Sequence, residues 1–148
     1  MRLEELRARV GQEIGVSQWH TVTQSQIDRF AEVTGDHQWI HLDQARAGRE
    51  SPYGTTIAHG FLTVSLLPML INEAVEMEGD FKMRVNYGFN RLRFTGAVPS
   101  GARVRARFSL ASIKDVEGGV EIAWGTTVEV EGREKPALVA EWLGRNYY

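Results

Sequence analysis

Residues 58–76 read AHGFLTVSLLPMLINEAVE and form a long apolar stretch near the middle of the chain. Apolar side chains follow one another so closely here that they would cover most of the circumference of a helix. Such a helix must be buried nearly all round, so we expect the other elements to wrap around it. Pro68 would remove one backbone hydrogen bond inside the helix, which predicts a kink at that point.

The sequence after this helix alternates between apolar and polar residues, the pattern of half-buried strands. Residues 81–94 predict one strand whose phase shifts near Asn90 and Arg91, which indicates a bulge. Further strands are expected over 104–110, 120–130 and 137–143, with a hairpin turn at 117–119. One buried helix followed by an antiparallel meander predicts an α+β fold in which a single sheet wraps one long central helix.

The segment before the central helix predicts a shorter helix followed by irregular chain. Thr23 and Gln26 are spaced as a capping box, and Gly35 predicts the end of this first helix. Residues 36–42 are then expected to be irregular. Asp43 should cap a short helix that ends at Gly48, and residues 49–56 should form a loop.

The composition indicates one globular domain over residues 1–148. Hydrophobic residues make up 43% and charged residues 24%, and a formal net charge of −2 gives no reason to expect a nucleic-acid partner. The chain has no cysteine, which excludes disulfides, thiolate catalysis and cysteine-bound metal. No run approaches the ~20 apolar residues of a membrane span, and the first residues lack a signal-peptide pattern, so we expect a cytoplasmic protein without membrane contact.

Residues 34–43, TGDHQWIHLD, carry candidate acid–base groups. Asp36 and His41 lie five residues apart in chain expected to be irregular, so both side chains could converge on one water molecule. Adding water to an activated double bond needs a base for the water, an acid for the adjacent carbon and stabilisation of enolate charge. The amide of Gly60, near the start of the central helix, could donate to the enolate oxygen. Taken alone, the three residues also fit a helix-ending turn, a packed histidine and a close-packed glycine.

Several blocks of the sequence resemble the signature of MaoC-like dehydratases, also called R-specific enoyl-CoA hydratases. They are residues 30–36, FAEVTGD, residues 40–43, IHLD, and residues 54–61, GTTIAHGF. A further block, residues 85–94 with the sequence VNYGFNRLRF, is similar to the branch that includes nodulation protein N and actinobacterial short hydratases. The resemblance covers nearly the whole chain.

This resemblance implies a hot-dog fold, in which a curved sheet wraps the long helix, and a homodimer whose two sheets join edge to edge. It implies reversible hydration of a trans-2-enoyl-CoA to the (R)-3-hydroxyacyl-CoA, without a metal or redox cofactor. Asp36 and His41 match the acid–base pair of the family, and the Gly60 amide matches the oxyanion donor. Coenzyme A and acyl-carrier protein present the same phosphopantetheine arm, so the carrier of the acyl thioester stays open.

Substrate-binding residues are expected around these groups, namely Trp39, Ile57, Ala58, His59, Asn86, Arg91 and Arg93. Trp39 could line the acyl channel or pack in the core, and Asn86 could reach the active-site loop or support the strand. Arg91 and Arg93 could bind the phosphates of coenzyme A or form a solvated strand face. His59 is expected to orient the loop or to pack beneath it. No metal site is expected, because the four histidines lack the spacing of common zinc motifs.

Two other functions stay open. A hot-dog thioesterase would place water against the thioester carbonyl, and such enzymes usually present a carboxylate from the central helix. Here that helix offers only Glu73 and Glu76, both late in it. A non-catalytic module that binds acyl thioesters would keep the groove without needing the acid–base pair.

Overall fold

The strands of the computed structural model, which describes residues 1–148, form one antiparallel sheet with the order β1-β4-β5-β6-β3. A sixth strand, β2, pairs with β4 beside β1. The long strands are β3 (Met83–Phe94), β4 (Arg103–Val116), β5 (Gly119–Val130) and β6 (Leu138–Tyr147), and the short ones are β1 (Glu13–Val16) and β2 (His20–Thr21). Because β3 stands last in the order, one of its sides has no neighbouring strand.

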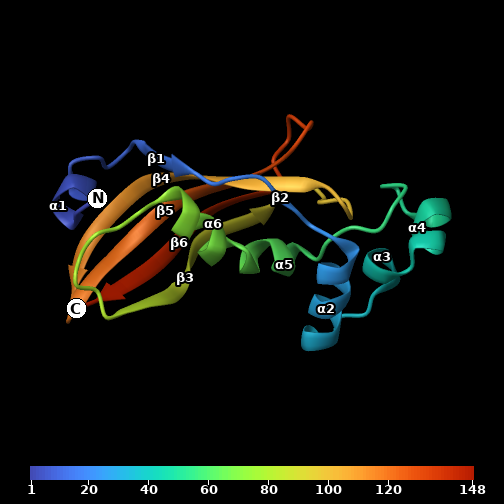
Figure 1. The fold of residues 1–148 in the computed structure, drawn as a ribbon, viewed down its shortest axis with the longest axis horizontal. Coiled ribbons are helices and arrows are strands. Elements are labelled where there is room, and N and C mark those ends of the chain that lie inside the picture. The colour runs from blue at the N-terminus through green and yellow to red at the C-terminus, as the bar shows by residue number, and fades with distance from the viewer.

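The helices lie along one face of this sheet and near both of its ends (Figure 1). Helices α5 (Gly60–Ser65) and α6 (Leu67–Ala74) run along the face, whereas α1 (Leu3–Arg7) sits near the opposite end from α2. Helices α2 (Gln24–Thr34), α3 (Trp39–Leu42) and α4 (Gln44–Glu50) gather beyond the end of α5. No helix has the length and apolar character needed to cross a membrane.

The predicted central helix is divided in two. The expectation of one helix over 58–76 was wrong, because α5 ends at Ser65 and α6 begins at Leu67. Pro68, where a kink was predicted, lies in the first turn of α6 just after the interruption, where its missing N–H would have had no partner in any case. Leu66 joins the two helices and still donates to the carbonyl groups of Leu62 and Thr63, so the chain stays close to helical.

Burial all round the central helix was also a wrong expectation for the single chain. Leu62, Leu67 and Leu70 face the core and are buried, but Phe61 is 66% exposed and Met69 is 39% exposed. The reason is that a single sheet covers only one side of the two helices. An apolar sequence pattern shows that a helix is to be covered, without showing what covers each side.

The core forms where α5 and α6 meet β4, β5 and β6. The alternation predicted for residues 104–110 is confirmed, because the side chains of Val104, Ala106, Phe108 and Leu110 are fully buried. Phe108 packs against Trp124 of β5, with ring centroids 6.5 Å apart in an edge-to-face arrangement.

Strand boundaries follow the predictions with local differences. The hairpin at 117–119 is confirmed, with Gly118 in the left-handed region at φ 76°, although Gly119 already belongs to β5. The bulge predicted near Asn90 is confirmed by a register shift between Phe89 and Arg91. The last strand is longer than 137–143, because β6 is held by β5 on one side and β3 on the other as far as Tyr147.

The segment before the central helix combines three confirmed predictions with two corrections. The Thr23 hydroxyl accepts from the backbone amide of Gln26 at 3.2 Å, and the Gln26 side chain accepts from the backbone amide of Thr23. Gly35 ends α2 at φ 77°. Residues 36–42, expected to be irregular, contain α3, and α4 passes through Gly48 to end at Glu50. A glycine within a helix costs stability but does not by itself end it. Asp43 caps α4 as predicted, by accepting from the Arg46 amide at 2.9 Å.

Candidate active site

Three side chains from separate segments meet at the end of the molecule that carries α2 and α3. They are Asp36, which follows α2, His41 of α3, and His59, which precedes α5. Each offers one side-chain nitrogen or oxygen atom that could bind a ligand, and these atoms lie within 4.8 Å of one another. Asp36 is exposed, whereas His41 is 6% and His59 is 2% exposed. The structure therefore brings Asp36 and His41 together, with His59 beside them.

The His41 ring is held in a defined orientation. Its Nδ1 lies 2.7 Å from the carbonyl oxygen of Ile57. Because a carbonyl can only accept, Nδ1 carries the hydrogen in the neutral ring, and Nε2 keeps a free lone pair. The main chain is fixed as well, since Gln24 donates to the carbonyl of His41 at 2.7 Å and accepts from the Thr56 hydroxyl at 2.7 Å.

Burial lowers the pKa of His41 below its ordinary value of 6.5. The hydrogen bond to Ile57 raises this pKa, the neighbouring His59 lowers it, and the Asp36 carboxylate raises it, each with a smaller effect than burial. His41 is therefore neutral at pH 7, with Nε2 able to accept a proton.

The Asp36 carboxylate stands at the turn after Gly35. One of its oxygens accepts from the amide of Gln38 at 3.4 Å, the pattern of a turn closed by an aspartate side chain. The rest of the carboxylate is exposed and has no hydrogen-bond partner in the chain. It is thus free to accept a hydrogen bond from a water molecule.

A groove of about 550 Å³ opens beside Gly60. Its walls include Ile57, Ala58, Phe61, Phe94 and Val98, and its rim carries Arg133 and Lys135. Gly60 is the first residue of α5, so its amide has no partner inside the helix. A Cβ at this position would lie 3.0 Å from the Phe94 ring, so the glycine also permits close packing.

The remaining predicted substrate-binding residues divide between this groove and other places. Ile57 and Ala58 line the groove, as expected, but Trp39 does not. Trp39 is half-buried, and the guanidinium of Arg46 lies 4.1 Å from its ring centroid. Arg91 and Arg93 are exposed on β3 and line none of the cavities described here.

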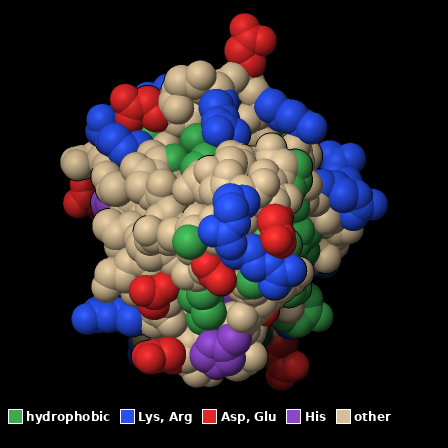
Figure 2. Space-filling view, turned by 90° about the vertical axis from the view of Figure 1, so that its right-hand side faces the viewer, with side chains coloured by type: hydrophobic (Ala, Val, Ile, Leu, Met, Phe, Trp, Pro, Cys, Tyr) green, Lys and Arg blue, Asp and Glu red, His purple; other side chains and the backbone are tan.

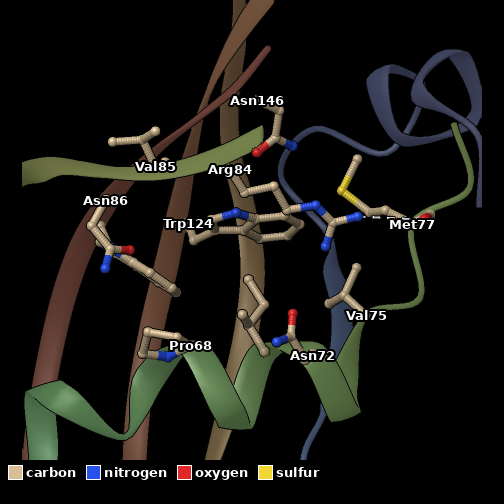
Figure 3. Close-up of a pocket in the computed structure, with 12 residues that line it drawn as sticks. Pro68, Asn72, Val75, Met77, Arg84, Val85, Asn86, Trp124 and Asn146 are labelled. Carbon is tan, nitrogen blue, oxygen red and sulfur yellow. Dashed lines mark hydrogen bonds between the residues drawn. The ribbon is translucent and has the colours of Figure 1, made fainter. Parts of the chain in front are cut away.

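Asn86 belongs to a second cavity, of about 250 Å³, between α6 and the sheet (Figure 3). Trp124 and Trp142 form its apolar wall, and Arg84 reaches across it toward the carbonyl of Met77 at 3.5 Å. This cavity shares no lining residue with the groove at Gly60. Within one chain, Asn86 is therefore apart from the Asp36 and His41 pair.

Charges of both signs surround the site. Figure 2 looks onto the end of the molecule that carries α2 to α4, where cationic and anionic side chains are interspersed. No field of one sign dominates this end. Binding of a charged substrate there would therefore depend on individual side chains.

Asp36, His41 and His59 are also residue types that bind divalent metals. The two imidazole rings are stacked, with centroids 3.8 Å apart and planes 25° from parallel. A ring nitrogen directs its lone pair within the ring plane, so stacked rings direct theirs along nearly parallel lines and not at one ion. This geometry favours the metal-free site predicted from the sequence.

Comparison with known proteins gives concordant results for sequence and structure. Residues 5–132 match the model of the MaoC like domain. The 3-hydroxyacyl-thioester dehydratase Z of Mycobacterium tuberculosis is 49% identical over 142 residues, which cover 95% of this chain and 93% of that protein. Nodulation protein N of Rhizobium meliloti is 43% identical over 142 residues, which cover 95% of this chain and 88% of that protein.

Solved structures share the fold. The MaoC-like dehydratase of Rhodospirillum rubrum superposes with a TM-score of 0.79 at 19% identity, over 99% of this chain and 97% of that one. The antiparallel sheet with its central helices is accordingly the α+β hot-dog fold. The chain belongs to the MaoC-like dehydratase family, in the branch of the mycobacterial dehydratase Z and nodulation protein N.

Proposed function

We propose that this member of the dehydratase family adds water reversibly to a 2-enoyl thioester, giving the 3-hydroxyacyl thioester. The proposal rests above all on one observation, the convergence of the Asp36 carboxylate and the His41 ring. Nε2 of that ring is free, and the ring is bonded to Ile57, a residue that lines the Gly60 groove. A mycobacterial relative named as a 3-hydroxyacyl-thioester dehydratase supports it. The family resemblance further predicts a trans-enoyl-CoA substrate and an (R)-product.

In the hydration direction, Nε2 of the neutral His41 takes a proton from water. Asp36 orients the same water by accepting a hydrogen bond from its other O–H. The water oxygen bonds to the β-carbon of the enoyl group, and the π electrons move toward the thioester carbonyl. The Gly60 amide donates to that oxygen as negative charge develops. The proton on His41 then passes to the α-carbon, so one water has been added and the imidazole is neutral again.

The thioesterase alternative lacks its expected carboxylate. Glu73, in α6, forms an ion pair with His20 at 2.8 Å, so its carboxylate is engaged away from the groove. Glu76 lies beyond the end of α6. Neither residue lines the groove at Gly60, and the only acidic member of the catalytic cluster is Asp36. We therefore do not propose thioester hydrolysis.

Arg133 and Lys135 are the cationic groups that the groove offers to a coenzyme A substrate. Both side chains are exposed and line the groove that includes Gly60. We assign the phosphates of coenzyme A to these residues, in place of Arg91 and Arg93. The double variant Arg133→Gln/Lys135→Gln should raise KM for crotonyl-CoA but not for crotonyl-pantetheine, which has no nucleotide. Equal KM values for the variant and the wild type with crotonyl-CoA would refute the assignment.

The exposed side of β3 supports the expected homodimer. Met83, Val85, Tyr87 and Phe94 are 39–55% exposed on this long edge strand. An unpaired apolar edge of this kind readily accepts another strand. We propose that β3 pairs with β3 of a second copy, which can be checked by light scattering during size-exclusion chromatography. A monomer at micromolar concentration would contradict this pairing.

The test of the function is the loss of enone ultraviolet absorbance when the purified protein meets crotonyl-CoA. The chirality of the product is read with an enantiomer-specific dehydrogenase. Rapid loss of absorbance with an (R)-product supports the proposal. Free thiol without loss of the enone would identify a thioesterase, and binding without turnover across several chain lengths would identify a binding module.

A further inference from the structure

We infer that His59 is a positioning residue that holds Asp36 and His41 in the arrangement needed for reaction. The inference rests on the proposed function, in which those two side chains act on one water. His59 is almost completely buried and its Nε2 is bonded to the Asp36 carbonyl, so its effect on the reaction passes through its neighbours. Three structural observations indicate how it does so.

The first observation is a hydrogen bond to the main chain of Asp36. Nε2 of His59 lies 3.0 Å from the carbonyl oxygen of Asp36 and donates to it. The other hydrogen bonds of residues 35–38 are local, reaching no further than α2 or α3. His59 is therefore the link that ties this exposed turn to the start of α5, beside Gly60.

The second observation is the stacking of the two imidazoles. The ring of His59 lies against the ring of His41 with centroids 3.8 Å apart. The His59 ring also contacts the ring of Phe30 in α2, with centroids 5.0 Å apart. One side chain thus touches both groups of the pair: the main chain of Asp36 through a hydrogen bond and His41 through ring contact.

The third observation is that Nδ1 of His59 is buried without a hydrogen-bond partner. An unpaired buried acceptor costs stability, a cost that an apolar side chain of similar size would avoid. Packing alone therefore does not account for an imidazole at this position. What the imidazole contributes beyond packing is the Nε2–H that reaches the Asp36 carbonyl.

Two substitutions separate the hydrogen bond from packing. In His59→Gln, the side-chain amide can place an N–H near the position of Nε2, whereas His59→Leu fills the space without a donor. Because misplacing a reacting group by about 1 Å can cost about 10²-fold in rate, we expect His59→Leu to lower kcat for crotonyl-CoA hydration by that order. KM should change by less than about twofold, because His59 does not touch the groove. His59→Gln should recover most of the lost kcat.

Phe30→Leu serves as the control for lost packing. It removes a ring contact of His59 without altering a hydrogen bond, so it should lower Tm while kcat stays within about threefold of the wild type. A further readout is the pH profile of kcat/KM. His59 lowers the pKa of His41 by more than Asp36 raises it, so loss of His59 should move the acidic limb to higher pH even if Asp36 is displaced.

The inference is overturned if folded His59→Leu retains the wild-type kcat, or if His59→Gln is no more active than His59→Leu. If the wild type hydrates none of the thioesters tested, the proposed function fails, but the positioning of the turn at residues 35–38 by His59 can still be tested. Nitrogen-15 NMR would then show His59 protonated at Nε2, and His59→Leu but not His59→Gln would shift the amide signals of residues 35–38. Unshifted signals in both variants would overturn the inference.

Discussion

Replacing Asp36 by asparagine should separate catalysis from stability. The structure gives the carboxylate a single hydrogen bond within the chain, the 3.4 Å contact from the Gln38 amide. Asparagine has a carbonyl oxygen at the same position and can accept that bond. Because the side chain is exposed, the free energy of unfolding should change by less than about 0.5 kcal/mol.

Catalysis should respond far more strongly, for two reasons. The amide is a weaker acceptor than the carboxylate and holds the water less firmly. The carboxylate also raises the pKa of His41, so its loss makes Nε2 a weaker base. Loss of a positioned acid–base group typically costs about 10²- to 10⁴-fold in rate. On the transition-state scale this is about 2.7–5.4 kcal/mol, several times the expected change in stability.

The two quantities are measured on one preparation, kcat/KM by the loss of enone absorbance and stability by urea unfolding. His37→Gln is the matched control, because His37 is the exposed neighbour of Asp36 and is not part of the cluster. It should behave as the wild type in both measurements. A folded Asp36→Asn protein with the wild-type kcat/KM would refute the role of the carboxylate.

Three further outcomes follow from the same geometry. The pKa of His41 in the folded chain is below 6.5, so between 6.5 and that lower pKa only the unfolded chain takes up a proton. The free energy of unfolding should therefore be highest above pH 6.5 and fall as the pH drops toward the pKa of the folded chain. His41→Gln should flatten this pH dependence in urea titrations. Gly15→Ala should destabilise by about 1–3 kcal/mol or more and lower Tm, because its Cβ would lie 1.9 Å from the backbone carbonyl oxygen of Ala74. Gly60→Ala should still fold, because the nearly half-exposed Phe94 ring can move away from the new methyl group. Its kcat/KM should fall, because the methyl group and the displaced ring narrow the groove.

Local signals in the sequence were sufficient for the parts of the fold that depend on neighbouring residues. The cap formed by Thr23 and Gln26 and the stop at Gly35 involve residues of one helix, so their spacing alone predicts the bounds of α2. The strand with Val104 and Phe108 was predicted for a similar reason, since its period of two records which face is buried.

The parts that the sequence did not predict depend on distant segments. Strands β1 and β2 are too short to show a period, and they exist because they pair with β4. The exposure of Phe61 follows from how much of α5 the sheet covers. In the same way, Arg133 lies far from Gly60 in the sequence and meets the same groove only because β5 and β6 return to that end.

In the proposed mechanism, burial decides which member of the pair removes the proton from water. His41 is buried against Ile57 and His59, and this environment keeps its ring neutral, with the lone pair of Nε2 available. When the ring takes a proton, the nearby Asp36 carboxylate stabilises the new positive charge and His59 opposes it. The resulting imidazolium is a strong enough acid to return its proton to the α-carbon. Because Asp36 is exposed, its carboxylate can bind water without the free-energy cost of desolvation that a buried carboxylate would carry. The proposed mechanism therefore gives the exposed carboxylate and the buried imidazole separate tasks: Asp36 holds the water and stabilises the charge, and His41 moves the proton.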